Sequence, residues 1–209
     1  MGTMDIPCMK GGKSGKLPVD TAFLGERVLA RTLFNAVVMY EANKRQGTHD
    51  TLTRAEVARA KKPLFKQKHT GNARVKHPQV PQCRGGGVAH GPHPREYRYA
   101  LPRKALRVAL RSALLAKFRD NQVSAVDSLG LTSPKTKDLA KLLRTVGCLA
   151  SCLIVVRAAD RNLLLAVRNL PRVKVMSARD LNAYDVALYR HILVTEDGLA
   201  AIKEIHDNA

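Results

Sequence analysis

The sequence predicts an α/β protein: a three-layer α/β/α domain with a mostly parallel sheet of about four strands, plus a long extended basic loop. Strand-like and helix-like apolar spacings alternate along residues 101–209, which is typical of parallel strands joined by right-handed helical crossovers. Residues 44–100 show neither spacing, and a structureless stretch of that length indicates a functional loop. A single domain is expected, because the roughly 43 residues before the loop are too few to fold alone.

One long helix is expected before the loop and another after it. Asp20 and Thr21 can cap a helix that runs to about Lys44, with apolar residues recurring on one face. Pro102 opens a second helix that runs to about Arg119. Beside the apolar strip of this second helix lies a basic strip, formed by Arg103, Arg107 and Arg111.

Strands and helical segments alternate over the rest of the chain. The continuous apolar run at 152–156 is typical of a strand buried on both faces. Gly147 can stop a helix that starts at Ser133 and Pro134, and Asp160 and Thr195 can cap two later ones. The strands are expected at 123–127, 152–156, 173–176 and 191–194. The helical segments are expected at 133–146, 160–170, 185–189 and 195–206.

The positive charge of the chain is concentrated in the loop. The chain holds 36 Lys and Arg against 17 Asp and Glu, a net charge of +19 that indicates a polyanionic partner. Residues 44–100 alone hold 13 basic and three acidic side chains. Basic residues alternate there with Pro, Gly, Gln, Thr and Asn, which suits an extended segment threading through RNA. The residues that carry this prediction are Lys61, Lys62, Lys66, Lys68, Arg74, Lys76 and Arg84.

Composition also excludes several classes of protein. No apolar run reaches the ~18–20 residues of a membrane span, so we expect no membrane partner. The first 24 residues resemble neither a signal peptide nor a transit helix, and we expect a cytoplasmic protein.

The four cysteines are too few and too scattered for a disulfide scaffold. Cys148 and Cys152 are expected as small buried side chains. The loop histidines and Cys83 match no zinc-site spacing, so no metal is expected. No cofactor is expected either.

Two patterns could indicate a small-molecule site. The run 84–87, Arg followed by three glycines, lacks the lysine of a P-loop and a preceding strand. It either lets the backbone approach RNA phosphates or acts as a flexible hinge. An open parallel sheet binds ligands at the carboxyl ends of its strands. No dinucleotide fingerprint follows the first strand, and two of the polar residues at the strand ends, Asp160 and Thr195, are expected as helix caps. We therefore expect no enzyme. The polar candidates at these ends are Asp127, residues 157–160, Ser177 and residues 195–197.

Several motifs together resemble the universal large-subunit ribosomal protein L-four family in its bacterial form. The resemblance covers nearly the whole chain from about Lys16, and the motifs follow the family's order. The loop and its borders carry Arg45-Gln46-Gly47-Thr48, Thr53-Arg54-Ala55-Glu56-Val57, Lys61-Lys62-Pro63, Arg84-Gly85-Gly86-Gly87-Val88 and Leu101-Pro102-Arg103-Lys104. The C-terminal half adds Pro134-Lys135-Thr136-Lys137, Arg168-Asn169-Leu170-Pro171 and Leu181-Asn182-x-Tyr184-Asp185.

The resemblance implies a structural, non-catalytic constituent of the large ribosomal subunit. Residues 17–47 and 97–209 would form the globular core, and residues 48–96 would form an arm that runs through 23S rRNA to the polypeptide exit tunnel. The protein would help early subunit assembly and line the tunnel past which the nascent polypeptide moves, with the arm of protein L-twenty-two at the constriction. The alternative is a free regulatory RNA-binding protein that acts on an mRNA.

The resemblance also implies which residues contact RNA and the tunnel. The residues expected to bind rRNA are Arg45, Gln46, Thr48, Arg54, Lys61, Lys62, Lys66, Lys68, Thr70, Gly71, Arg74, Lys76, Arg84, Gly85, Gly86, Gly87, Arg95, Arg103 and Arg107. The residues expected at the tunnel tip are Phe65, Lys66, Gln67, Lys68 and His69.

Overall fold

A computed structural model describes residues 3–10, 13–74, 76–129 and 133–207 of the chain. The chain divides into two units, which we call the globular unit (Met1–Glu41 with Ala100–Ala209) and the arm (Ala42–Tyr99). Among the described residues, no helix combines the length and the apolar character that crossing a membrane would require.

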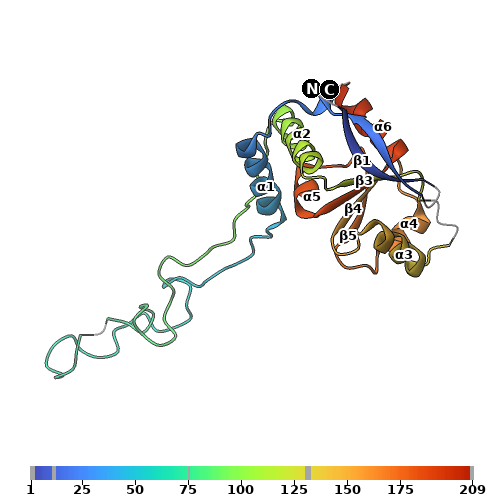
Figure 1. The fold of residues 1–209 in the computed structure, drawn as a ribbon. Helices are drawn as coiled ribbons and strands as arrows, with labels where there is room; N and C mark the ends of the chain where they lie inside the picture. Colours follow the sequence, from blue (N-terminus) through green and yellow to red (C-terminus); the bar gives the residue numbers. More distant parts are fainter. Residues whose placement is uncertain (1–2, 11–12, 75, 130–132, 208–209) are drawn as a thin grey trace. The chain divides into compact units, whose positions relative to one another are not determined.

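The globular unit is built on one mixed sheet of six strands (Figure 1). The strand order is β2-β1-β3-β6-β4-β5, and all neighbours are parallel except the antiparallel hairpin β1–β2. The predicted α/β class is therefore confirmed. The strands are β1 (Thr3–Lys10), β2 (Lys13–Asp20), β3 (Val123–Val126), β4 (Cys152–Val156), β5 (Val173–Ser177) and β6 (His191–Thr195).

The expected strand number was wrong because the N-terminal hairpin was not predicted. In β1, Met4, Ile6 and Cys8 alternate with the exposed Asp5 and Pro7. Ile6 and Cys8 are buried, which is the period-two pattern of a half-buried strand. β2 carries a glycine and a proline and becomes a strand by pairing with β1.

The long helix expected from Asp20 begins ten residues later. A side-chain oxygen of Asp20 instead accepts a hydrogen bond from the Ala22 amide at 2.9 Å, at the start of the short 3₁₀ helix η1 (Ala22–Leu24). Gly25 follows with φ +90°, a left-handed conformation that ends the turn. The helices are α1 (Ala30–Lys44), α2 (Arg103–Arg119), α3 (Thr136–Val146), α4 (Arg161–Val167), α5 (Ala183–Leu188) and α6 (Glu196–Asp207).

Helix ends follow the predicted chemistry at two places and depart from it at three others. Asp160 lies at the N-cap position of α4, but its side chain makes no capping hydrogen bond. Gly147 ends α3 with φ +80°, and the Thr195 hydroxyl accepts a hydrogen bond from the Gly198 amide at 3.1 Å to cap α6. The helix α3 begins at Thr136 rather than at Ser133. The helix α5 begins two residues early, because the Asn182 side chain accepts a hydrogen bond from the Asp185 amide at 2.8 Å.

Two apolar cores on opposite faces of the sheet make the predicted three layers. Leu153 and Val155 of β4 pack in one core with α2, α5 and α6, whereas Ile154 packs in the other with α3 and α4 (Figure 1). All five residues of β4 are buried, as its continuous apolar run predicts. Cys148 and Cys152 lie in the second core as free, buried thiols.

The arm has almost no regular secondary structure. Past the last residues of α1, its described residues contain no helix or strand. Its outgoing and returning segments lie side by side, joined by hydrogen bonds (Figure 1). The Arg95 amide donates to the Gly47 carbonyl at 3.2 Å, and the Val88 amide donates to the Leu52 carbonyl at 2.9 Å.

Candidate nucleic-acid interface

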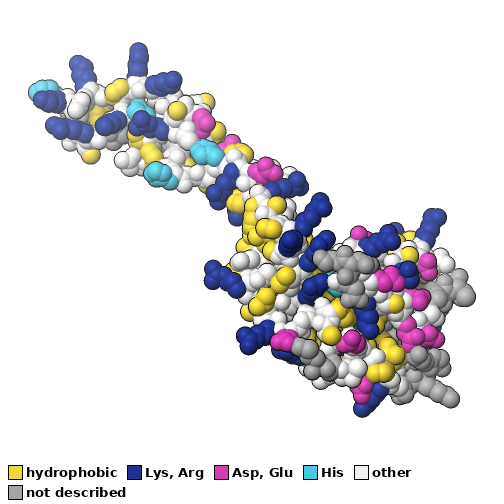
Figure 2. Space-filling view, turned by 90° about the horizontal axis from the view of Figure 1, so that it is seen from above, with side chains coloured by type: hydrophobic (Ala, Val, Ile, Leu, Met, Phe, Trp, Pro, Cys, Tyr) yellow, Lys and Arg dark blue, Asp and Glu magenta, His cyan; other side chains and the backbone are white. Residues whose placement is uncertain are grey.

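The arm presents a strongly basic surface. It carries 13 Lys and Arg against three acidic residues, and Figure 2 shows blue basic side chains gathered on it with few acidic ones. Every predicted rRNA-binding Lys and Arg of the arm is exposed, as are Arg103 and Arg107 at the start of α2. The third member of the predicted basic strip, Arg111, instead donates a hydrogen bond to the His206 carbonyl at 2.7 Å.

Three parts of the arm differ in how they are held together. We call residues 42–50 and 93–99 the root, residues 51–59 and 77–92 the knot, and residues 60–76 the tip. Hydrogen bonds cross-link the root and the knot internally. In the described part of the tip, 60–74 and 76, the structure gives no side-chain hydrogen bond or ion pair, so only the first two parts are held by contacts of their own.

In the root, two arginines lie against one tyrosine. The guanidinium carbon of Arg45 lies 4.0 Å from the centroid of the Tyr97 ring, and that of Arg95 lies 4.5 Å from it. Arg95 donates a hydrogen bond to the phenol, which together with the charges of Arg45 and Arg95 lowers the pKa of Tyr97. Gln46 and Thr48 are exposed beside this cluster.

In the knot, a buried glutamine ties two segments together. The Gln79 side chain, 4% exposed, donates hydrogen bonds to the carbonyls of Val57 at 2.8 Å and Arg59 at 3.0 Å. The Gln79 carbonyl accepts a hydrogen bond from the Gly87 amide at 2.9 Å. The Arg59 guanidinium donates to the Arg84 carbonyl at 2.7 Å. Residues about 20 positions apart are thus fixed to one another.

A smaller turn within the knot is held by a carboxylate. Glu56 accepts hydrogen bonds from both the amide and the hydroxyl of Thr53, each at 2.7 Å. These bonds stabilise the charged form and lower the pKa of Glu56. The neighbouring Arg54 remains exposed.

The glycine run 84–87 packs against the arm itself. A Cβ on Gly86 would collide with the Val80 carbonyl, and one on Gly87 with the backbone of Arg54. Gly87 is buried and its amide is bonded, so the run is not a free hinge. The close backbone approach that the glycines allow is, in this structure, an approach to the arm's own chain; contact of this run with RNA stays a prediction.

The tip carries the residues predicted to face the tunnel. Lys66, Gln67, Lys68 and His69 are exposed, and Phe65 is half-buried. His69 has φ +65° and Gly71 has φ +70°, so the chain turns there through left-handed conformations. Thr70 lies exposed between them, and Lys61, Lys62, Arg74 and Lys76 are exposed on either side.

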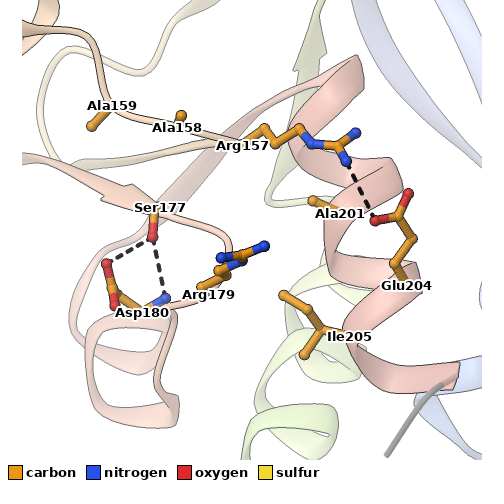
Figure 3. A pocket seen from close by; sticks show the side chains of 9 residues that line it. All are labelled: Arg157, Ala158, Ala159, Ser177, Arg179, Asp180, Ala201, Glu204 and Ile205. Atoms are coloured by element: carbon orange, nitrogen blue, oxygen red, sulfur yellow. Dashed lines mark hydrogen bonds and ion pairs between the residues drawn. The ribbon is translucent and has the colours of Figure 1, made fainter.

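The strand ends of the globular unit form an open cleft of about 850 Å³. Figure 3 shows Arg157 and Arg179, from two strand ends, reaching toward α6. Arg157 lies 3.7 Å from the Glu204 carboxylate, and the Ser177 hydroxyl donates to Asp180 at 2.7 Å. Two arginines and two carboxylates line the cleft, so it carries no surplus charge for a polyanion.

Neither the loop histidines nor the strand ends gather ligands for a metal. Within the described ranges, no three His, Cys, Asp or Glu side chains lie close enough together to hold an ion. One loop histidine, His93, instead lies with its Nδ1 3.2 Å from an Asp50 oxygen in the root.

Three residues with a structural role in the arm were not predicted. Tyr97, between basic residues at 95 and 98, could have been noticed as an aromatic amid arginines, a pattern that suits cation–π contacts. Gln79 and Arg59 gave no local signal, because their partners lie 20 to 25 residues away in sequence.

Comparison with known proteins agrees with the motifs. Residues 17–205 match the Ribosomal protein L4/L1 family. The large ribosomal subunit protein uL4 of Desulforudis audaxviator is 39% identical over 205 residues, covering 98% of this chain and 99% of the relative. The uL4 protein of Symbiobacterium thermophilum is 42% identical over 196 residues, covering 94% and 95%. The chain therefore belongs to the ribosomal protein L4/L1 family, as its motifs predicted.

Proposed function

We propose that this protein is a structural constituent of the large ribosomal subunit, and that its arm binds 23S rRNA. The relatives are named as large ribosomal subunit proteins, and they match nearly the full length of this chain. The family is one of structural proteins, and we propose no catalytic activity for this protein. As part of a bacterial-type ribosome, the protein would reside in the cytoplasm.

The surplus charge of the arm is the observation that carries rRNA binding. Its net charge is +10 over 58 residues. Leaving Lys44 aside, no described Lys or Arg of the arm has a carboxylate partner in an ion pair. Exposed cations without acidic partners fit the phosphates of a nucleic acid that packs around the arm.

Two further parts of the proposal concern assembly and the exit tunnel. We propose that the arm helps the subunit assemble early by joining segments of 23S rRNA. Within the tip, residues 65–69 would line the tunnel beside protein L-twenty-two and the nascent polypeptide. The exposed lysines of the tip and its lack of described internal bonds support this role, because such a segment can take its shape from surrounding RNA.

Sedimentation of a cell extract tests the ribosomal role. At physiological salt, the protein should travel with large subunits and leave them only as the salt concentration rises. If most of the protein ran free of large subunits, the proposal would fail, and the alternative of a regulatory mRNA-binding protein would be favoured instead.

Two charge reversals test the tunnel assignment. Lys68→Glu places a carboxylate near the phosphates of the RNA around the tip, a repulsion on the order of 1 kcal/mol. Sensitivity to macrolide-type antibiotics should therefore change, whereas the yield of large subunits should not. Arg84→Glu, in the knot, should lower subunit yield. The measurements are drug sensitivity and the yield of large subunits for both variants. Wild-type behaviour of Lys68→Glu in both would contradict the tunnel assignment.

A further inference from the structure

We propose that Arg45, Tyr97 and Arg95 form a clamp at the root of the arm that holds a phosphate of the RNA backbone, with Tyr97 as its positioning residue. The inference rests on the proposed function and assigns a phosphate site within it. Tyr97 would not need to touch RNA, because its part is to hold the two guanidinium groups.

The clamp is assembled by a close approach of two chain segments. The Arg95 amide donates to the Gly47 carbonyl at 3.2 Å. Gly47 has φ +74°, and a Cβ there would collide with the Arg95 carbonyl and lie 3.0 Å from the Tyr97 ring. A glycine at position 47 therefore brings Arg45, on the outgoing segment, to the arginine and tyrosine of the returning segment.

The two positive charges of the clamp are not balanced by an acidic side chain in the described part of the chain, so a bound anion would stabilise it. Both guanidinium carbons lie within 4.5 Å of one ring centroid, so two like charges are held near each other. In the described part of the chain, neither Arg45 nor Arg95 is paired with a carboxylate. The hollow beside them is also lined by Arg98 and by one acidic residue, Glu96.

The aromatic ring explains how the two cations stay together. An arginine stacks favourably on the electron-rich face of a tyrosine, and the planar guanidinium keeps its N–H groups free to donate at the ring's edge. Each guanidinium fork can donate two parallel hydrogen bonds to the oxygens of a phosphate group. The strand-end cleft of the globular unit also has two arginines, but its two carboxylates balance them.

Binding to a 23S rRNA transcript, measured between about 50 and 200 mM salt, tests the clamp. The full-length protein is compared with Tyr97→Phe, Tyr97→Leu, the double variant Arg45→Gln/Arg95→Gln, and the triple combination. Arg179→Gln, in the neutral cleft, is the matched control for loss of one arginine. A thermal melt of each variant shows that the globular unit is folded.

The clamp predicts a distinct pattern of affinities. Tyr97→Phe keeps the ring and loses only the hydrogen bond from Arg95 to the phenol, so its affinity should stay close to that of the wild type. Tyr97→Leu also loses the ring and should bind roughly three- to tenfold more weakly. The double variant should reduce the slope of log affinity against log salt by about 0.7–0.9 for each phosphate contact that is lost. Tyr97→Leu should weaken binding no further once both arginines are gone.

Failure of the clamp and failure of the proposed function give different results. If Tyr97→Leu binds as tightly as Tyr97→Phe, or Arg179→Gln lowers affinity as much as the double variant, the clamp is wrong although rRNA binding stands. If the wild-type protein shows no salt-dependent binding to 23S rRNA, the proposed function is wrong and the clamp with it.

Discussion

The globular unit and the arm are held together by different interactions, although one chain forms both. The globular unit has buried aliphatic cores on both faces of a sheet, with side chains such as Leu153 and Ile154 fully buried. The knot of the arm is held by hydrogen bonds to carbonyl groups from Gln79 and Arg59, and by glycines at points of close contact. Most basic side chains of the arm are thus exposed, whereas the apolar side chains of the globular unit pack in its own cores.

The charges of the two units show the same difference. The globular unit has a net charge of +9 over 151 residues, and the arm has +10 over 58. Ion pairs such as Arg157–Glu204 and Lys174–Asp185 lie in the globular unit. High charge density without acidic partners is unfavourable for a segment standing alone and favourable for one surrounded by phosphates.

Removing the arm should have the largest effect and should separate the two units. Joining Arg45 to Tyr97 through a short Gly/Ser linker should leave a cooperative melt, because both apolar cores lie in the globular unit. Affinity for 23S rRNA should fall on the order of 100-fold or more, because most phosphate contacts are lost. A molten or insoluble product would show that the arm contributes to the core.

A cavity in the sheet should destabilise the globular unit strongly. Leu153→Ala removes a fully buried side chain and should lower the free energy of unfolding by about 2–5 kcal/mol, measured by urea denaturation. Leu164→Ala, at a side chain that is 47% exposed, is the control and should change it by less than about 0.5 kcal/mol. Equal effects of the two substitutions would contradict the described core.

Loss of the buried glutamine should open the knot without unfolding the globular unit. In the free protein, trypsin should cut first in the tip, between Lys61 and Lys76. Gln79→Ala removes both side-chain bonds and should increase cleavage at Arg59 and Arg84 roughly tenfold. Gln82→Ala, at an exposed position, should not. Rapid cleavage at Arg59 in the wild type would show that the knot is not formed before RNA binds.

The smallest expected effect is a local response to acid. The pKa of Glu56 is lowered in the folded arm, so the Thr53–Glu56 turn is stabilised above the ordinary pKa of glutamate. This stabilisation should be lost as the pH falls through the lowered, folded-state pKa. The Thr53 amide resonance should report the change by NMR while the resonances of β4 stay constant. A Glu56→Gln variant that still showed the transition would contradict this assignment.

Local sequence patterns predicted the elements whose stability is decided locally. The apolar run at 152–156 gave β4 its correct bounds, and Gly147 and Thr195 marked helix ends correctly. β2 was missed because Gly15 and Pro18 disfavour a strand in isolation, and only pairing with β1 makes it one. Asp20 pairs with Thr3 as the last residue of β2, so the helix that was expected to start at Asp20 does not start there.

The candidate interface was predictable in its charge and not in its architecture. The basic side chains of the arm could be listed from the sequence, because charge needs no fold to be recognised. The contacts Gln79–Val57 and Arg45–Tyr97 join residues 22 and 52 positions apart, and no local pattern reports such pairs. Gly86 and Gly87 were noticed as a motif, but their packing partners were not.

The knot has a consequence for the entropy of binding. Ordering a residue of a free chain costs about 1–2 kcal/mol of conformational entropy. If all of the arm had to be ordered by rRNA, that cost would extend over 58 residues. With the root and the knot already fixed by their own hydrogen bonds, it is confined to the tip, the segment between Arg59 and His77. In the proposed binding to rRNA, a larger share of the free energy of the phosphate contacts would then remain as net affinity.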